Sequence, residues 1–287
     1  MISPPLRLLF ALCCSLSLAC ASSSGTRALS PLEAPAPRGE GELRVMTFNI
    51  QSGARGLEGV AEVIRQARPD IVALQEVDLG GQRASGLDQA AVLAQRTGLE
   101  HHAHFRTTDL HGGAYGIALL SRFPLEALAQ YPLPVPRGAE PRTVVHAVLQ
   151  VSGREVSVYL THLIRRPFNG DSRLRQSALI AGLLAKDPRP KLLMGDLNDD
   201  PGSRPVRLLR RDLTDVFAAS GQGPAGTYPL PLPFSPALRI DYVLASDAFV
   251  PLRSRVLRVD ASDHYPLVAD VRLEEPKHTA PVVSAAP

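Results

Sequence analysis

The chain has 287 residues, of which 45% are hydrophobic and 21% charged, and this is the composition of an ordinary globular protein. Its 31 basic and 28 acidic residues leave a formal net charge of +3, too small a surplus to indicate a nucleic-acid-binding protein by itself. All three cysteines, Cys13, Cys14 and Cys20, lie in the first twenty positions. Residues 21 to 287 therefore contain no disulfide framework, no thiol nucleophile and no cysteine-ligated metal.

The first twenty residues have the pattern of an export signal. Arg7 precedes the apolar run 8–18, which is too short to span a bilayer, and small residues follow it. Two routes of processing stay open: cleavage before Cys20 with a lipid attached to its sulfur, as in bacterial lipoproteins, or ordinary cleavage after Ala21. We favour the lipoprotein route. We therefore expect an exported protein of the cell envelope, lipid-anchored to the membrane through Cys20, or otherwise periplasmic or secreted.

Two segments of low complexity flank the part of the chain that we expect to fold. Residues 1–20 form the leader, and residues 21–41 are rich in Ser, Pro, Ala and Gly without apolar periodicity, which indicates a flexible linker. Residues 275–287 are predicted to be a disordered tail. The intervening residues 42–274 contain no internal repeat or second linker, so we predict one large domain.

The predicted elements of this domain alternate apolar strand patterns with helical spacing. In chain order, we predict a strand at 43–50, a helix at 59–67, a strand at 70–74, a helix at 87–97, strands at 117–121, 143–151 and 156–161, a helix at 172–184, and strands at 191–194, 239–245 and 267–273. Because two strands often follow one another without a helix between them, a strict alternation of strand and helix is excluded. A two-sheet core with outer helices fits this order better.

Polar residues that can perform chemistry gather at the ends of these strands. They are Asn49, Glu76, His162, Asp196, Asn198, Asp241, Asp263 and His264. Placing a carboxylate or imidazole beside a buried strand is costly unless the group is paired or binds a metal. A single case is usually a turn residue or a surface histidine, but the repetition at so many strand ends is hard to explain in this way. Oxygen and imidazole donors without sulfur suit Mg²⁺ and a phosphate ester better than a structural zinc.

Seven short motifs occur in a fixed order along the domain. They are Leu43–Asn49, Asp70–Glu76, Ala118–Arg122, Thr161–Leu163, Gly195–Asn198, Arg239–Leu244 and Ser262–His264. This ordered set resembles the signature of the endonuclease/exonuclease/phosphatase superfamily, typified by deoxyribonuclease I, abasic-site endonucleases, neutral sphingomyelinases and inositol-phosphate 5-phosphatases. The resemblance covers residues 43–273 and implies an α+β fold: a single-domain, deoxyribonuclease I-like, four-layer α/β/β/α sandwich.

The resemblance also implies a metal site. Glu76 matches the metal-binding glutamate, and Asn49 lies beside it in contact with metal or phosphate. Asp263 matches a residue that ligates the metal or a water bound to it. The implied cofactor is Mg²⁺, with Mn²⁺ as a substitute.

The catalytic roles follow from the same resemblance. His264, oriented by Asp241, matches the general base on the attacking water, because a neutral imidazole held in one tautomer suits that role. An aspartate at the place of Asp196 has also been proposed as the base, and we keep both. Asp196 and Asn198 match the pair that positions the nucleophile and the phosphate. His162 matches a histidine of the deoxyribonuclease I and sphingomyelinase branches that supports charge on the phosphate oxygens or the leaving group.

Two further pairs of polar residues follow His162 in the sequence. Arg165 and Arg166 follow it directly and either bind a phosphate of the substrate or form a solvated pair. Arg173 and Gln176 lie early on the next predicted helix, and the resemblance implies that they form a structural brace there.

Two other segments have open interpretations. The histidines in residues 101–104 are predicted to lie on a surface loop or strand edge rather than in a metal cluster. Tyr228 either lines the pocket or packs in the core. The apolar, proline-rich segment 228–234 that it begins either shapes the pocket mouth or is a rigid connector.

These observations together predict an exported, metal-dependent phosphoesterase, foremost a phosphodiesterase that acts by in-line attack of a His- or Asp-activated water. A lipid headgroup, a nucleic acid and a small phosphodiester stay open as substrates, and a nuclease is the alternative within the enzyme class. The alternative outside it is a non-catalytic envelope binding protein on the same scaffold. We expect a monomer.

Overall fold

The computed structural model describes residues 38–39, 41–165, 167–230 and 235–275. The predicted leader, most of the linker, Arg166, residues 231–234 and the tail from residue 276 lie outside the described residues. Within the described part, no helix has the length and apolar character needed to cross a membrane.

Two mixed β-sheets form the centre of the molecule. The first runs in the order β10 (Gly221–Gln222), β12 (Phe249–Val256), β13 (Leu267–Leu273), β1 (Glu42–Asn49), β2 (Ile71–Leu79), β4 (Gly113–Ser121), β3 (His101–Leu110). The second runs in the order β5 (Glu126–Leu133), β6 (Arg142–Val151), β7 (Arg154–His162), β8 (Lys191–Asp196), β11 (Asp241–Ala245), β9 (Thr214–Asp215). Within this order β1 is parallel to β2 and β7 is parallel to β8.

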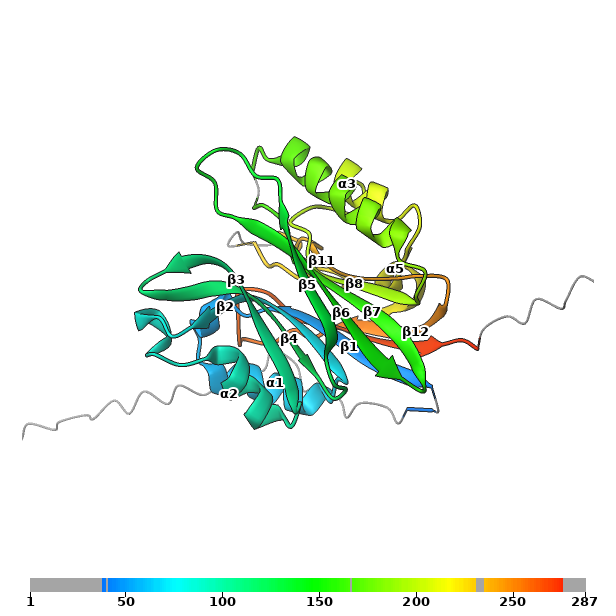
Figure 1. Cartoon of the computed structure of the whole chain (residues 1–287), viewed down its shortest axis with the longest axis horizontal. Coiled ribbons are helices and arrows are strands. Elements are labelled where there is room, and N and C mark those ends of the chain that lie inside the picture. The colour runs from blue at the N-terminus through cyan, green and yellow to red at the C-terminus, as the bar shows by residue number, and fades with distance from the viewer. Residues whose placement is uncertain (1–37, 40, 166, 231–234, 276–287) are drawn as a thin grey trace, which may run out of the picture.

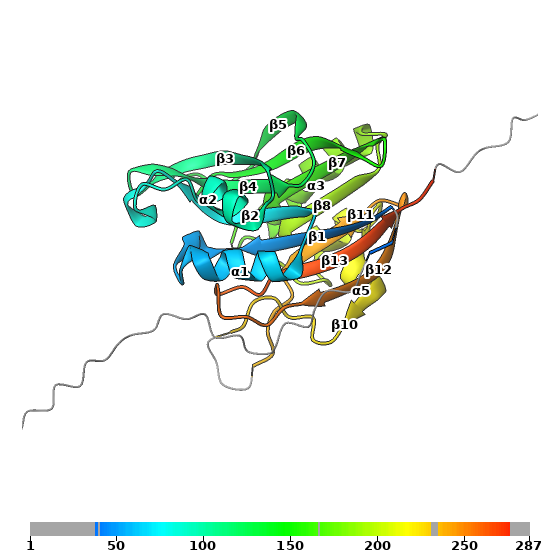
Figure 2. The same ribbon diagram turned by 90° about the horizontal axis from the view of Figure 1, so that it is seen from below.

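Helices cover the outer faces of both sheets. They are α1 (Leu57–Ala67), α2 (Gln89–Thr97), α3 (Gly170–Lys186) and α4 (Arg204–Leu209), whereas the short α5 (Val216–Ser220) adds Val216 and Phe217 to the core between the sheets. Figure 1 shows α1 and α2 on one side of the two sheets and α3 on the other, and Figure 2 shows the same layers after a quarter turn. The predicted four-layer α/β/β/α sandwich is therefore confirmed.

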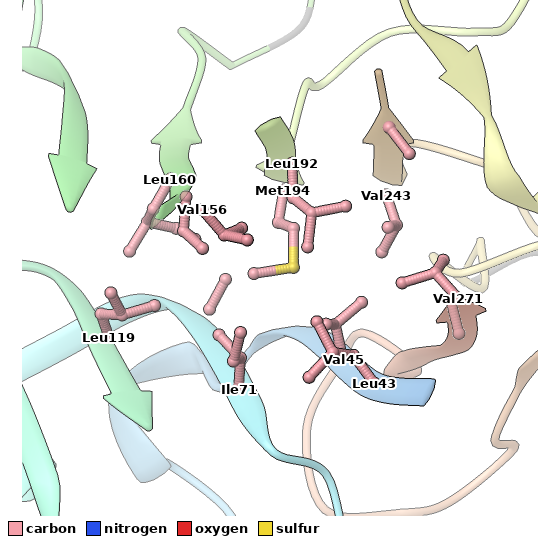
Figure 3. Close-up of a cluster of buried hydrophobic side chains, with 14 of the residues drawn as sticks. Leu43, Val45, Ile71, Leu119, Val156, Leu160, Leu192, Met194, Val243 and Val271 are labelled. Carbon is pink, nitrogen blue, oxygen red and sulfur yellow. The ribbon is translucent and has the colours of Figure 1, made fainter. Parts of the chain in front are cut away.

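Alternating apolar residues hold the two sheets together. In β1, Leu43 and Val45 point into the space between the sheets, whereas Met46 and Phe48 pack in the cluster that includes α1. This alternation follows from the two-residue repeat of a strand. Figure 3 shows the inter-sheet side chains meeting from both sides, with Met194 near the middle. Each sheet thus has one face in the central core and the other under helices.

The predicted elements agree with the structure where the apolar pattern is strong. The first strand, the helix at 59–67 and the strands at 143–151 and 156–161 appear within a few residues of their predicted bounds. The sequence does not predict β3 as a full strand. Its histidines do lie at a sheet edge, as expected, because β3 is the last strand of the first sheet. β5 was missed because five of its eight residues are exposed, so its sequence has no alternating apolar pattern.

Gly195 allows β7 and β8 to approach at the point where β8 delivers its last residue. Its φ is +147°, and a Cβ built there would lie 1.9 Å from the carbonyl oxygen of Thr161. A side chain at this position must therefore force the strands apart or change the backbone of Gly195.

We predict that Gly195→Ala lowers the free energy of unfolding by about 2 kcal/mol or more, as overpacking against backbone does. Urea denaturation measures this change. Gly182 in α3 is the matched control, because a Cβ there meets nothing within 4 Å. Gly182→Ala is expected to raise stability by about 0.5–1 kcal/mol, the usual gain within a helix. A Gly195→Ala protein with the wild-type unfolding midpoint would contradict this account.

Candidate active site

The ends of three neighbouring strands place three site residues in one row across the second sheet. His162 ends β7 and is paired in register with Asp196 at the end of β8. Asp241 begins the antiparallel strand β11 and is paired with the same Asp196. All three are almost fully buried. The sheet register therefore brings together residues that are up to 79 positions apart in the sequence (241 − 162).

The first sheet supplies Asn49 and Glu76 by a different device. Asn49 is the last residue of β1, and its neighbour on the parallel strand β2 is Gln75. Glu76 follows Gln75 at a bulge, where the pairing of β2 with β4 shifts register, and it has a φ of +56°. A bulge re-aims the side chain of the extra residue. The Asn49 amide donates a hydrogen bond of 3.0 Å to Glu76 Oε1 and one of 3.3 Å to Asp196 Oδ2, which links the two sheets.

A loop before β13 brings His264 and Asp263 to the row. The Ser262 hydroxyl donates to the carbonyl oxygen of Asn49 at 2.7 Å and accepts from the His264 backbone N–H at 3.3 Å, so the loop is fastened to the end of β1. His264 Nδ1 lies 2.9 Å from Asp241 Oδ2. With Nδ1 held in this way, Nε2 is left facing Asp196.

Asp196 lies between the two histidines. Its Oδ2 is 3.5 Å from His162 Nε2 and 3.8 Å from His264 Nε2. Its Oδ1 accepts the backbone N–H of Asn198 at 2.8 Å. Asn198 has a φ of +52°, and its side-chain amide donates to the Leu163 carbonyl at 3.1 Å. Asn198 is thus held between the ends of β7 and β8.

Burial and neighbouring charges shift the pKa values of these groups in opposite directions. Burial and the charge of Asp241 raise the pKa of Asp196 to about 7, against the opposing influence of His264. Burial alone would lower the pKa of His264, but Asp241, Asp196 and Asp263 outweigh it and raise that pKa to about 10. Burial, Arg142 and His264 hold the pKa of His162 well below 6.5, so His162 is neutral at physiological pH.

Carboxylates outnumber the cations in this site. Burial and the charge of Asp263 raise the pKa of Glu76 above its usual value, despite the hydrogen bond from Asn49 and the opposing charge of His264. Among the described residues, Asp241 Oδ1 is buried without a hydrogen-bond partner. Asp196, Asp241 and His264 also offer ligand atoms within 4.8 Å of one another. The site as a whole is rich in carboxylate oxygens, those of Glu76 and Asp263 among them, and this chemistry fits a hard divalent cation.

The site residues line a cleft of about 650 Å³. Glu76, His162, Asp196, Asn198, Asp263 and His264 all contribute to its wall, and so does Arg165. Tyr228 lines the cleft as well, with its ring centroid 4.8 Å from that of His264, which settles the choice between pocket and core in favour of the pocket. Arg166, predicted as a partner of Arg165, lies outside the described residues.

The predicted brace between α3 and the strand ends is present. Arg173 Nε donates to Asp199 Oδ2 at 2.8 Å, and its Nη1 donates to the Ile164 carbonyl at 3.2 Å. The Gln176 side chain accepts the Ile164 backbone N–H at 3.0 Å and donates to the Pro134 carbonyl at 3.0 Å. Both residues are buried. They fix the segment that leaves His162.

Arg142 was not found by the sequence reasoning, yet it lines the cleft. It is 7% exposed, its Nη1 pairs with Glu140, and its buried Nε has no hydrogen-bond partner among the described residues. Its place at the start of a strand with nothing unusual in the flanking residues gives no signal in the sequence. The positive charge of Arg142 acts on His162 and lowers its pKa. The same charge, on a residue that lines the cleft, can attract an anionic oxygen there.

Comparison with known proteins identifies a family model and a curated relative that this chain resembles. A sequence model of the Endonuclease/Exonuclease/phosphatase family matches residues 46–264. Protein cwh43 of Schizosaccharomyces pombe is 30% identical over 153 residues, which are 53% of this chain and 15% of that protein, so the chain spans a small part of the length of this curated relative.

Solved structures of other proteins also resemble this chain. An endonuclease/exonuclease/phosphatase from Beutenbergia cavernae is 30% identical, with a TM-score of 0.68 over 81% of this chain and 72% of that one. The human Nocturnin catalytic domain, solved with a bound sulfate anion, shares the fold at 21% identity, with a TM-score of 0.64 over 81% of this chain and 94% of that domain.

Proposed function

Because the chain belongs to the endonuclease/exonuclease/phosphatase family, we propose that it is a phosphodiesterase that uses a divalent cation held in its cleft. Members of this family are generally phosphoester hydrolases that depend on divalent metals. The observation that carries the proposal is the convergence of His162, Asp196 and the Asp241–His264 pair on one cleft that Glu76 also lines. A non-catalytic binding protein has no need of this complete set.

Asp196 and His264 are proposed to accept the proton of the attacking water together. Asp196 Oδ2 and His264 Nε2 are 3.8 Å apart. The pKa of the Asp196 carboxyl is raised to about 7, and the pKa of the His264 imidazole is raised to about 10. Two groups coupled so closely titrate as a pair, so the base is the pair rather than one residue. Asp241 holds His264 in one orientation through Nδ1. Asn198 holds Asp196 through its backbone N–H.

His162 and Arg142 are proposed to bind the phosphoryl oxygens. His162 is neutral and buried, so it can donate one hydrogen bond without the cost of burying another charge. Arg142 adds a permanent positive charge and an N–H with no other partner among the described residues. Both donors are held in place before the substrate arrives, and such preorganised donors stabilise charge that develops in a transition state.

Glu76 and Asp263 are the residues we propose as ligands of the cation, with Asn49 beside them. Burial, and to a lesser extent the charge of Asp263, raises the pKa of Glu76, and a bound cation would stabilise the charged carboxylate against both effects. When bound, Mg²⁺ or Mn²⁺ would neutralise negative charge on the phosphoryl group. Asn49 supports Glu76 through its 3.0 Å hydrogen bond.

We predict that His264→Ala and Asp196→Asn each lower kcat on bis-p-nitrophenyl phosphate by about 100-fold or more, the usual effect of losing general-base catalysis. Arg142→Ala is expected to lower kcat as well, because it removes a positive charge that stabilises the phosphoryl oxygens in the transition state. Leu128→Ala, which changes an exposed residue of β5 that does not line the cleft, is the control and should keep the wild-type kcat. Full activity in His264→Ala would overturn the catalytic assignment.

A second prediction concerns the cation. Titration of the metal-free protein with Mn²⁺, followed by electron paramagnetic resonance, should show one or more bound ions per chain. Glu76→Gln should weaken that binding because it removes a carboxylate charge while keeping the side-chain volume. Gln66→Glu, the reverse exchange of amide and carboxylate at an exposed position of α1, is the control. Unchanged Mn²⁺ affinity in Glu76→Gln would exclude Glu76 as a ligand.

Export is the third part of the proposal, and the leader sequence supports it. If Cys20 carries a lipid, membrane fractions of cells that express the full chain should contain the protein, and Cys20→Ser should release it. Cys13→Ser is the matched control. A Cys20→Ser variant that stays in the membrane fraction would contradict the lipid anchor.

A further inference from the structure

The mouth of the cleft is bordered by apolar side chains that the proposed chemistry does not use. Pro167, Leu110 and Leu230 line the cleft, and Phe168 follows Pro167 with its surface fully exposed. We propose that this rim, defined as Leu110, Arg165, Pro167, Phe168 and Leu230, seats the protein on a phospholipid bilayer with the cleft facing the headgroups. A lipid-headgroup phosphodiester is then the substrate class, and this second step rests on the proposed function.

Phe168 carries the inference because a wholly exposed phenylalanine is unusual on a protein of this composition. The chain has 8 phenylalanines and no tryptophan, and Phe168 is 100% exposed. Its φ of +65° is uncommon for a bulky residue, so its backbone conformation is not the one that a phenylalanine ordinarily prefers. Exposed aromatic and leucine side chains next to basic ones are the pattern of surfaces that enter the headgroup region of a membrane.

The loop that presents Phe168 is held at both ends. The Asn169 side-chain amide donates to the Arg165 carbonyl at 2.8 Å and closes the turn. At its base, Ile164 is buried and fastened through its backbone by Arg173 and Gln176. A loop fixed in this way presents its apolar side chain at little further entropic cost when it meets a partner.

The other side of the mouth is also apolar. Leu110 ends β3 at the hairpin that leads to β4, and it is 36% exposed. Leu230 belongs to the segment after Tyr228 and is half-buried. Leu110, Pro167 and Leu230 come from three separate parts of the chain and line the same cleft. A flat apolar medium can contact all three, whereas a small soluble substrate has no need of them.

Positive charge lies beside this rim. Arg165 is exposed on the cleft wall, and further exposed arginines lie on α4, in a separate surface depression. Arg204 of α4 lies 3.8 Å from Asp171 in the first turn of α3, only a few residues after Phe168. Arg204, Arg207, Arg210 and Arg211 surround the half-buried Leu174 and Leu208 in one surface depression. Arginines next to apolar side chains suit an anionic leaflet, to which each basic residue near the surface adds attraction.

A single-stranded nucleic acid is the partner that these features favour less. Bases are bound on aromatic platforms. In the described part of the rim Phe168 is the one aromatic residue, and the neighbouring Tyr228 ring already packs against His264.

The absence of tryptophan makes a local test available. Phe168→Trp introduces a single tryptophan at the rim, and Leu128→Trp introduces one at a 46% exposed leucine of β5 that does not line the cleft. On addition of vesicles of phosphatidylcholine and phosphatidylglycerol in a 3:1 ratio, the emission of Phe168→Trp should move to shorter wavelength and become protected from iodide quenching. Leu128→Trp should show neither change. Because both proteins have the same N-terminus, an anchor at Cys20 cannot produce the difference.

Three results would overturn the inference. They are an unchanged Phe168→Trp spectrum with the vesicles, an equal change in Leu128→Trp, and a change with a single-stranded oligonucleotide but not with vesicles. Vesicles of phosphatidylcholine alone should give a smaller change, because they lack the anionic headgroups. Hydrolysis of bis-p-nitrophenyl phosphate is assayed with the same proteins. Hydrolysis without a spectral change rejects the docking surface alone, whereas a spectral change without hydrolysis rejects the proposed enzyme activity and leaves the docking surface.

Discussion

The face-to-face packing of the two sheets is the constraint on which the rest of the structure depends. Leu43 and Val45 of one sheet meet Leu160 and Met194 of the other in a core with almost no solvent exposure. Since each strand alternates its side chains, this packing also decides which residues reach the outer helices. Several strands also end at the same edge of the packed sheets, so the polar residues at those ends share one small volume.

That shared volume explains the electrostatics of the site. Four acidic residues, Glu76, Asp196, Asp241 and Asp263, lie near two histidines at the edge of an apolar core. The pKa values of Glu76 and Asp196 are raised, first because burial disfavours the charged carboxylate, and also because Asp263 adds negative charge near Glu76 and Asp241 adds it near Asp196. A protein that keeps such a costly arrangement gains little stability from it. Its worth lies in chemistry, since a cation, a proton and a phosphate can all be held where the repulsion is relieved.

The catalytic residues, here called the floor of the cleft, and the rim are held in place by different means. Strand register, a bulge and short polar hydrogen bonds position the residues of the floor. The rim consists of loops, and one of them is held by Arg173 and Gln176, whose side chains bond the backbone of Ile164 rather than any substrate. This separation lets the loops differ in chemistry while the floor stays the same. The exposed Phe168 belongs to the loops of the rim, so it bears on the binding partner and not on the reaction.

The sequence by itself determined the two-sheet architecture, because runs such as 43–50 and 156–161 have an apolar pattern that fits strands and little else. Its ordered polar motifs also identified Glu76, Asp196, Asp241 and His264 as candidates. Only the tertiary structure decided that His162, Asp196 and Asp241 stand in one row, that a bulge aims Glu76 into the cleft, and that Arg142 has a free donor there. These facts depend on register and on contacts between residues far apart in the chain, and local patterns of side chains carry no record of either.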